Sequence, residues 1–294
     1  MRHYMKQMMV TALDRTLPVY IETMGWNEWQ DEFIRPKGYH CYHWLQTTSG
    51  AGLFECSGKS VTLSPNQGVL LPPNVPHRYV TTSHPWSTWY ITFNGNHAPF
   101  IVSSLGLATS TVIRWEPDSP LTNLHRRSRK LVGRNFDFNG MDGSAFVYRF
   151  LIDLKKHGQV DNQRSLSQHH VRLMPLFRFL EENYSNPALG LAHMAAFMGV
   201  SPQRLNSLFR LSTGMSPYQF LISLRIQKAK ELLINEENIT VKAVATLVGF
   251  FDASHFIVTF RKLETITPEI YRELNKYSAG KHIQNSNTWD ARDE

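Results

Sequence analysis

Two short stretches of this 294-residue chain place polar and charged side chains on what would be one face of a helix. In the first, Ser201 and Pro202 signal the start of a helix, because a hydroxyl caps free N–H groups and proline fits the first helical position. The side chains that follow can hydrogen-bond to base edges or bind phosphate. They are Gln203, Arg204, Asn206, Ser207 and Arg210. The stretch therefore predicts a recognition helix for a major groove.

The second stretch lies about fifty residues further on and is more apolar. Asp252 can cap its helix, and Phe256 with Phe260 would hold the inner face on a core. The outward set is Ser254, His255, Ile257, Val258, Arg261 and Lys262. Ile257 and Val258 can touch thymine methyl groups but cannot make the bidentate hydrogen bonds that discriminate bases most strongly. We therefore expect the first stretch to carry most of the direct readout.

Both stretches belong to one pattern that occurs twice. An alanine stands four residues before a glycine, as Ala195 and Gly199 in the first copy and Ala245 and Gly249 in the second. The alanine lets two helices cross closely, and the glycine can take the positive φ of a sharp turn, so each copy predicts a helix-turn-helix. One copy alone could be an ordinary helical corner. Two copies joined by the predicted helix 217–234 would place their recognition helices about 34 Å apart, in successive major grooves.

With these motifs, residues 189–274 resemble the DNA-binding domain of the AraC/XylS family of bacterial transcription regulators. The resemblance rests on Gly199-Val200-Ser201-Pro202, Gly214-Met215-Ser216-Pro217 and Val248-Gly249-Phe250, among others. It implies double-stranded DNA and RNA polymerase as partners and no catalytic residues. The second copy departs from the family pattern at Phe251, Val258 and Thr265, where the family usually has a small polar residue, arginine and glycine. These departures affect the base specificity of the second copy.

From Val19 to about Thr111 the pattern changes to short strands rich in aromatic and β-branched residues, divided by Gly, Pro, Ser and Asn. Many such strands at close spacing predict a sandwich or barrel. The run Pro65–His77 resembles the second motif of the cupin barrel. We therefore expect an α+β protein of two domains. The N-terminal domain would be a cupin-like β-barrel with two dimerisation helices, and the C-terminal domain would be all-α with two helix-turn-helix motifs.

A set of side chains in the predicted barrel could bind a small polyol. Arg35-Pro36 and His77-Arg78-Tyr79 resemble segments of the family's sugar-binding cupins, and Tyr90 takes the place of a tryptophan that stacks on the sugar there. Independently, a polyol needs paired donors and acceptors and a flat apolar face, which arginine, histidine and tyrosine supply. The expected effector site is Arg35, His77, Tyr79 and Tyr90. The alternative is that the rings fill a small barrel while Arg35 pairs with Asp31 or Glu32.

A metal-dependent cupin enzyme with a helical appendage is a competing interpretation. The first cupin motif, His-x-His, is missing, because His40 and His43 are three residues apart and would point to opposite faces of a strand. His77 alone is more often the wall of a pocket than a metal ligand. We therefore expect no metal, no cofactor and no enzyme activity. A third interpretation keeps DNA binding and gives the barrel only a dimerising role.

The expected domain boundaries are 1–157 for ligand binding and dimerisation, 158–170 for a polar linker, 171–277 for DNA binding and 278–294 for a tail. Residues 1–17 show no strong periodicity. Two helices are expected between Pro120 and Lys156. In the family the equivalent helices form an antiparallel dimer contact, for which we predict Val147, Leu151 and Leu154. The alternative is that these side chains only pack on the barrel.

Composition sets the outer limits. The hydrophobic content is 42%, as in globular proteins, and neither a membrane-length apolar run nor a secretory signal is evident. The two cysteines, Cys41 and Cys56, indicate free thiols. A net charge of +7 is compatible with a polyanionic partner. Together the sequence predicts a cytoplasmic, homodimeric transcription regulator that responds to a small molecule, with a sugar as the expected class.

Overall fold

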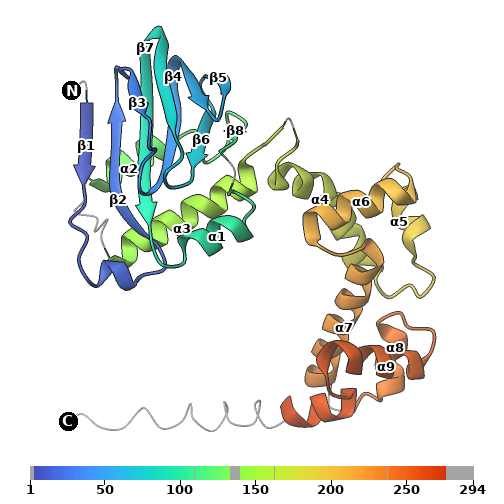
Figure 1. Cartoon of the computed structure of the whole chain (residues 1–294). Helices are drawn as coiled ribbons and strands as arrows, with labels where there is room; N and C mark the ends of the chain where they lie inside the picture. The colour runs from blue at the N-terminus through green and yellow to red at the C-terminus, as the bar shows by residue number, and fades with distance from the viewer. Residues whose placement is uncertain (1–2, 109, 133–139, 162, 237, 276–294) are drawn as a thin grey trace, which may run out of the picture. The chain divides into compact units, whose positions relative to one another are not determined.

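The computed structural model describes residues 3–108, 110–132, 140–161, 163–236 and 238–275 (Figure 1). The chain folds into two compact units, Met1–Gln168 and His169–Glu294. The first is built mainly of strands and the second of helices, which is the expected α+β class. The predicted tail, 278–294, lies outside the described residues. Within the described ranges, no helix combines the length and the apolar character needed to span a bilayer.

The N-terminal unit contains one antiparallel sheet with the order β1-β2-β7-β4-β6-β8, while β3 pairs with β7 and β5 with β4. Its strands are β1 (His3–Gln7), β2 (Tyr20–Asn27), β3 (Phe33–Arg35), β4 (Tyr42–Cys56), β5 (Lys59–Leu63), β6 (Gln67–Leu71), β7 (His77–Asn94) and β8 (Val112–Arg114).

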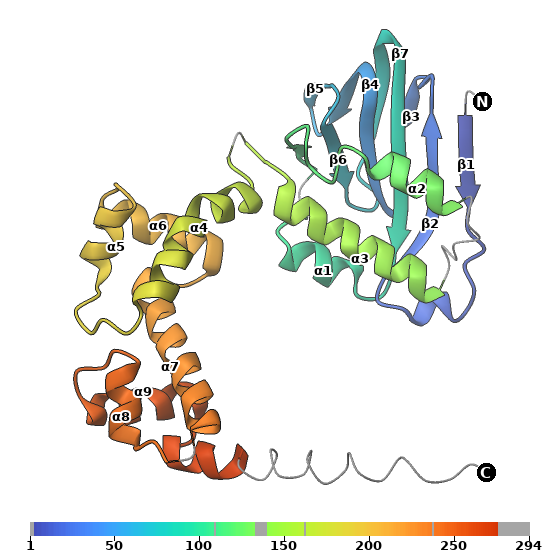
Figure 2. The ribbon, with the colours of Figure 1, turned by 180° about the vertical axis from the view of Figure 1, so that it is seen from behind.

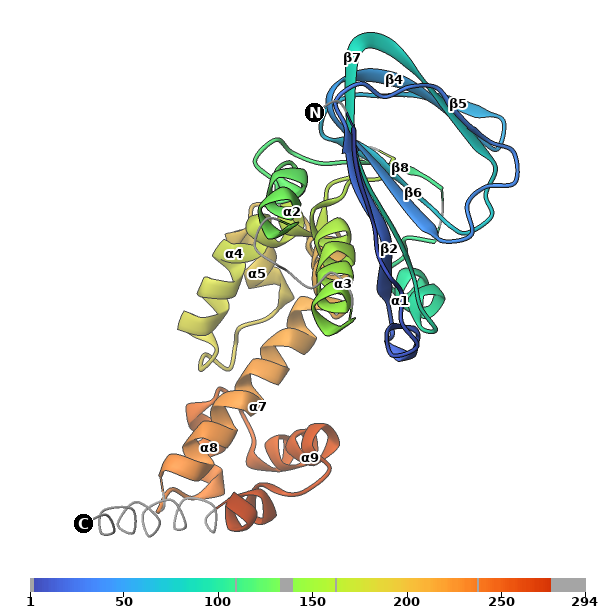
Figure 3. The same ribbon diagram turned by 90° about the vertical axis from the view of Figure 1, so that its left-hand side faces the viewer.

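Contrary to the expected barrel, the sheet is strongly curved but not closed, since β1 and β8 do not pair among the described residues (Figure 3). The backbone of Gln159 instead pairs with Arg114 of β8, with N–O distances of 3.0 and 2.7 Å. This contact satisfies polar groups that the edge strand would otherwise expose.

The two central strands are longer than the sequence predicted. β4 runs through serine and glycine positions, and β7 runs through serine and proline positions, that we interpreted as breaks. The pairing of β4 with β7 shifts register between Thr47 and Gly52, where Gly50 has a φ of 70°. Such bulges bend a strand without ending it, which explains why one bent strand replaces two short ones.

Alternating side chains of these strands form two cores on opposite faces of the sheet. One face packs against α1 (Ala98–Ser104), α2 (Leu124–Val132) and α3 (Gly140–His157) (Figure 2). There the rings of Trp44 and Trp89 lie 5.5 and 6.1 Å from that of Phe150. The other face is enclosed by the curvature of the sheet, and its apolar part includes Leu45, Phe54 and Trp86.

The residues predicted to form the dimer contact lie inside the first core. Val147, Leu151 and Leu154 are at most 1% exposed. They pack on the sheet, as the alternative interpretation held, because α3 needs this apolar stripe to cover the tryptophans. They are therefore not available to a partner chain.

The N-terminal arm is more ordered than its lack of periodicity indicated. β1 adds to the free edge of β2, and the ring of Tyr4 stacks on Trp26 at 4.0 Å. A 3-10 turn, η1 (Asp14–Thr16), follows. The buried Asp14 carboxylate accepts hydrogen bonds from the Thr11 N–H and hydroxyl and from the N–H of Gly140 at the start of α3. Long-range pairing, which local periodicity does not report, orders this segment.

The helices of the C-terminal half are α4 (Leu166–Asn183), which begins three residues before the C-terminal unit, α5 (Leu191–Phe197), α6 (Pro202–Thr213), α7 (Pro217–Asn235), α8 (Val241–Leu247), α9 (Ala253–Glu264) and helical residues 268–275. α4 begins at Leu166, five residues before the predicted Val171, so part of the predicted linker is helical. At 1.5 Å per residue, α7 is roughly 28 Å long.

α7 contributes to two separate cores. Its first half places Leu221 and Leu224 among the buried side chains around α4, α5 and α6. Its second half places Ile226, Ala229 and Leu233 among those around α8 and α9. One continuous helix thus supports both helix-turn-helix motifs.

Arg225 of α7 is buried, which is unusual for a charged side chain. It is 3% exposed, and its guanidinium donates from Nε to the carbonyl of Tyr184 at 2.8 Å and from Nη2 to that of Asn186 at 2.7 Å. These carbonyls belong to the loop after α4. Because Tyr184 also contacts both cores, the loop joins the two motifs at a second point.

Candidate nucleic-acid interface and ligand site

The first predicted recognition helix is α6, and its start is built as the sequence indicated. Gly199 turns the chain with a φ of 63°, and the hydroxyl of Ser201 accepts a hydrogen bond from the N–H of Arg204 at 3.2 Å. Pro202 occupies the first turn. Leu205, Leu208 and Phe209 are buried on the inner face. The helix is therefore fixed by its core, and its other face is open to solvent.

That open face carries the predicted DNA-binding side chains of the first copy. Asn206 is half-buried, and the others are exposed. The exposed ones are Ser201, Pro202, Gln203, Arg204, Ser207 and Arg210. Donors and acceptors near the N-terminus of a supported helix can reach base edges and phosphates.

The second predicted recognition helix, α9, has the same construction. Gly249 has a φ of 86°, and the carboxylate of Asp252 accepts a hydrogen bond from the N–H of His255 at 3.0 Å. Backbone N–H donors from His255 and Ser254 lower the pKa of Asp252. Phe256 and Phe260 are buried, and Ile257 is half-buried against the same core. The exposed candidates are Ser254, His255, Val258, Arg261 and Lys262.

Phe251 was not among the predicted DNA-binding residues, but its position makes it a candidate. Its side chain is 81% exposed, directly before the cap of α9. Val258, on the same helix, is 66% exposed. An exposed ring next to a recognition helix can contact thymine methyl groups. The sequence signal was present, since Phe251 is a departure from the family pattern.

All four predicted effector-site residues meet on the enclosed face of the sheet, together with His43. We call these five residues, Arg35, His43, His77, Tyr79 and Tyr90, the interior cluster. The ring of His77 lies 5.6 Å from that of His43 and 6.2 Å from that of Tyr79, and His43 lies 6.2 Å from Tyr90. Arg35 stands over the ring of Tyr39 at 4.3 Å. Its alternative partner Glu32 binds Arg78 instead, at 2.7 Å.

Several polar atoms of this cluster are buried without a hydrogen-bond partner. They include Nη1 of Arg35, Nδ1 of His43 and Nε2 of His77. Oγ1 of Thr81, four residues after His77 on β7, is buried without a partner too. Buried polar groups are normally paired, so these atoms need an explanation. Nδ1 of His77 lies 2.8 Å from the carbonyl of Val75, which can only accept, so Nδ1 carries the proton. Nε2 is then an acceptor with a free lone pair.

Burial and the Arg35 charge set the protonation states of the cluster. Burial lowers the pKa of His43 and of His77, and the guanidinium lowers both further. Burial raises the pKa of Tyr79 to about 12, and it raises that of Tyr90. At neutral pH both imidazoles and both phenols are therefore uncharged, and Arg35 is the cation of the cluster.

His43 is the member of the cluster that the sequence did not predict. It is 2% exposed on β4, opposite Thr92 of β7. Nothing local distinguishes it from a core residue, because its partner His77 lies 34 positions away and comes close only through the pairing of β4 with β7. The correct register of these strands would have identified it.

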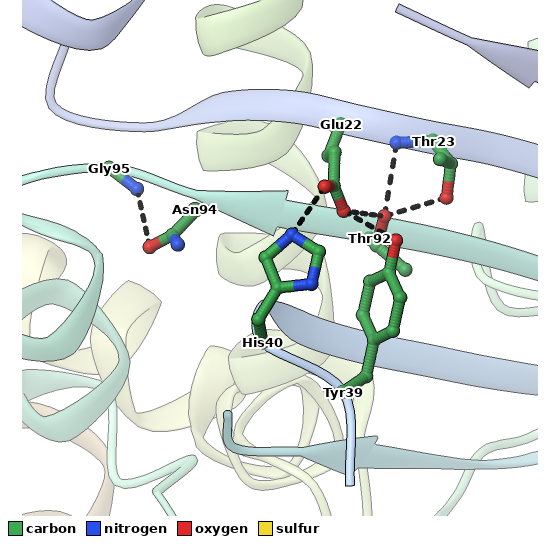
Figure 4. A network of polar contacts seen from close by, with 7 residues as sticks. All are labelled: Glu22, Thr23, Tyr39, His40, Thr92, Asn94 and Gly95. Carbon is green, nitrogen blue, oxygen red and sulfur yellow. Dashed lines mark hydrogen bonds and ion pairs between the residues drawn. The ribbon is translucent and has the colours of Figure 1, made fainter. Parts of the chain in front are cut away.

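A second polar network surrounds Glu22 beside the interior cluster (Figure 4). The Glu22 carboxylate accepts hydrogen bonds from the hydroxyls of Tyr39 at 2.8 Å and Thr92 at 3.3 Å, and it lies 2.5 Å from Nε2 of His40. Burial opposes ionisation of Glu22, but hydrogen bonds from the Tyr39 hydroxyl and the Cys41 thiol, together with the nearby His40, lower its pKa. Burial, then the Glu22 carboxylate, raises the pKa of Cys41 to about 12.

Comparison with known proteins agrees with this arrangement of two units. Residues 18–151 match the family model of the AraC-like ligand binding domain, and residues 194–274 match that of a helix-turn-helix domain. The first match contains the interior cluster, and the second contains α6 and α9.

Relatives with similar sequences include regulators of sugar operons. The raffinose operon transcriptional regulatory protein RafR of Pediococcus pentosaceus is 24% identical, over 79% of this chain and 83% of that protein. The arabinose operon regulatory protein of Escherichia coli (strain K12) is 24% identical, over 84% of this chain and 85% of that protein. Among solved structures, the C-terminal domain of the response regulator yesN from Fusobacterium nucleatum is 30% identical, over 33% of this chain and 94% of that one, with a TM-score of 0.33.

The order of the two matches is that of a sensor followed by a DNA-binding domain, and the relatives are transcriptional regulators rather than enzymes. The chain therefore belongs to the AraC family and is a ligand-responsive, DNA-binding transcriptional regulator.

Proposed function

We propose that this regulator binds a sugar, or a closely related polyol, at the interior cluster. The observation that supports this proposal is a buried hydrogen-bond donor and a buried hydrogen-bond acceptor in one cluster, both without a partner. Nη1 of Arg35 needs an acceptor, and Nε2 of His77 needs a donor. A hydroxyl group can accept from one and donate to the other, whereas a carboxylate can only accept.

The rings around these atoms suit the rest of such a ligand. Tyr79 and Tyr90 offer flat apolar faces, and Tyr90 can lie over β2 because Gly25 has no side chain to displace it. Sugar sites combine such faces with a few fixed polar groups. The raffinose and arabinose operons named for two relatives support the same class of ligand.

The test is a thermal-shift screen of the full chain against sugars and polyols, followed by titration of any compound that raises the melting temperature. A ligand that binds only the folded state raises it by mass action. Arg35→Met should then weaken binding about 10- to 100-fold, the effect of losing a charge-assisted hydrogen bond.

Arg78→Met is the matched control, because Arg78 is exposed and pairs with Glu32 and Glu55. This variant should bind like the parent. A panel without any stabilising sugar, or undiminished binding by Arg35→Met, would contradict the proposal and favour a unit that only dimerises.

For DNA we propose that Gln203, Arg204, Asn206 and Ser207 read bases, with α9 adding apolar contacts from Ile257 and Val258. Ser201 and Pro202 set the start of α6, and Ser254 and His255 stand at that of α9. Arg210, Arg261 and Lys262 bind phosphates. Phosphate contacts supply salt-dependent affinity, and base contacts supply specificity.

The double variant Arg204→Ala/Asn206→Ala should therefore lose the specific footprint. Lys262→Ala should weaken binding to all sequences and lower the salt slope by about 1. Arg178→Ala, an exposed arginine of α4, is the control. An unchanged footprint in the double variant would refute the readout by α6.

We further propose that the protein acts as a homodimer with RNA polymerase, in the cytoplasm, where its DNA lies. The ligand-binding and dimerisation domain would cover 1–157 and the DNA-binding domain 171–277. A ligand at the interior cluster would change the geometry of the dimer or of the linker within 158–170, and with it the spacing of half-sites that two chains occupy together.

A further inference from the structure

We propose that Glu22, His40 and Cys41 form a binding site for a zinc ion, beside the interior cluster and separate from its proposed sugar site. A carboxylate oxygen of Glu22, a ring nitrogen of His40 and the Cys41 sulfur all lie within 4.8 Å of one another. Among the described residues this is the group of such side chains with the spacing of a metal site.

The fold brings these donors together from two segments. β2 and β7 shift register between Ile21 and Thr23, so Glu22 stands at a bulge. Bulges re-aim side chains, and here the carboxylate faces Tyr39 and His40, which come shortly before β4 (Figure 4). His40 and Cys41 are adjacent in sequence and reach the carboxylate from the same turn of the chain.

Hydrogen bonds to one oxygen of the Glu22 carboxylate also fix its orientation. The hydroxyls of Tyr39 and Thr92 both donate to Oε2 of Glu22, at 2.8 and 3.3 Å, while Oε1 lies toward His40. Metal-binding carboxylates are commonly oriented by hydrogen bonds of this kind. Thr92 is itself fixed by the hydroxyl of Thr23 at 2.7 Å. One oxygen is thus used by the protein, and the other is directed at the proposed ion.

The donor set selects the metal. Sulfur, imidazole nitrogen and carboxylate oxygen together suit Zn²⁺, whereas Mg²⁺ and Ca²⁺ prefer oxygen alone. Zinc ligands at about 2.0–2.3 Å from the ion lie roughly 3–4 Å apart. The Glu22 oxygen and the His40 nitrogen, now 2.5 Å apart, would therefore separate slightly to admit the ion, while all three donor atoms already lie within 4.8 Å of one another. Three protein ligands leave a fourth position for water.

Exposure provides a path for the ion. The His40 side chain is 64% exposed and can adjust its position, while Cys41, directly before β4, is 2% exposed. Binding converts the thiol to a zinc-bound thiolate, and its proton passes to the solvent. The process is coordination with release of one proton, with no change of oxidation state.

The experiment is a Co²⁺ titration of the full-length, chelator-treated protein. Cobalt bound by a thiolate gives a charge-transfer band, and Zn²⁺ should abolish the band by displacement. We expect one ion per chain. Cys41→Ser should lose the band, and Cys56→Ser, which removes the other buried cysteine, should keep it.

His40→Ala provides a second readout, because an exposed side chain can be removed without disturbing the fold. It should weaken cobalt and zinc binding at least tenfold, whether or not Cys41→Ser folds. The proposal is wrong if the parent protein shows no band, if the band depends on Cys56 instead of Cys41, or if His40→Ala binds as tightly as the parent.

Discussion

At the scale of single residues, His43 and His77 determine how the N-terminal unit responds to acid. Both imidazoles are buried beside Arg35, and burial and the guanidinium charge lower their pKa values. Protonating either one in the folded protein would place a second cation next to a buried arginine. In the unfolded chain each histidine titrates near its ordinary pKa of about 6.5.

The difference predicts an acid-labile fold. Below about pH 6.5 the unfolded chain binds protons that the folded chain does not, so stability falls as pH decreases toward the lowered folded pKa values. Above that pH the contribution of these histidines is constant. Urea unfolding followed between pH 7.5 and 5 should show a loss of up to about 1.4 kcal/mol per pH unit for each histidine. In His43→Gln this slope should decrease, and an identical slope would contradict the assignment.

The residues that the sequence predicted correctly share local signals, and those it missed do not. The N-caps Ser201 and Asp252 are visible within four residues of sequence. The burial of Arg225 is not visible in the local sequence, because the two carbonyls that accept hydrogen bonds from its guanidinium lie in the loop after α4. A charged side chain can be buried where it has hydrogen-bond partners, and these two carbonyls lie about forty positions before Arg225 in the sequence.

At the scale of elements, the two turn glycines look equivalent in sequence but differ in structure. Gly199 and Gly249 both have positive φ. A Cβ on Gly199 would meet no atom within 4 Å, whereas one on Gly249 would lie 2.5 Å from the carbonyl oxygen of Tyr184. The first turn needs glycine only for its backbone angle, and the second needs it also for close packing.

Two alanine variants separate these contributions. Gly199→Ala should destabilise the C-terminal unit by about 1–2 kcal/mol, the cost of a left-handed conformation for a residue with a Cβ. Gly249→Ala should cost distinctly more, because the Tyr184 backbone must also move. Denaturant unfolding of both variants measures the difference. Equal losses of unfolding free energy would show that the Tyr184 backbone can move away from the added Cβ without an energetic penalty.

The same scale explains where strand prediction failed. Alternating aromatic and β-branched residues identified the cores of β4 and β7. The sequence suggested a break between Gln46 and Gly52, around Gly50, but pairing with β7 continues through this segment. A glycine ends a strand or bends it depending on whether the neighbouring strand bends too, which local sequence does not show.

At the scale of the whole molecule, a dimer contact cannot use Val147, Leu151 and Leu154, because they are buried. We therefore propose that it lies on the other, exposed side of α3. Met141, Ala145, Tyr148 and Ile152 recur at spacings of four, three and four residues, as in the seam of a coiled coil. Met141 is 76% and Tyr148 51% exposed.

Tyr148→Glu should therefore convert a dimer to a monomer in analytical ultracentrifugation, since it places charge in the centre of this seam. Lys156→Glu, a charge reversal at an exposed position of the same helix, is the control and should leave the association state unchanged. A monomeric parent protein, or a dimeric Tyr148→Glu variant, would argue against this surface.

The two-part organisation was predictable because each part has its own sequence signature. Repeated glycine turns identify the helical unit, and short aromatic segments identify the sheet. Closure of the sheet was not predictable. It depends on whether the first and last strands pair, and here the backbone of Gln159 pairs with the outer edge of β8.

The continuity of α7 through both cores fixes the angular phase of the two DNA-reading surfaces. Each residue inserted near its middle would rotate α9 by about 100° about the helix axis relative to α6 and displace it by about 1.5 Å. One added residue should therefore turn the second surface away from the duplex. Seven residues, nearly two turns, should restore its direction but shift it by roughly 10 Å, so the operator would need a correspondingly longer spacing between its two recognised segments.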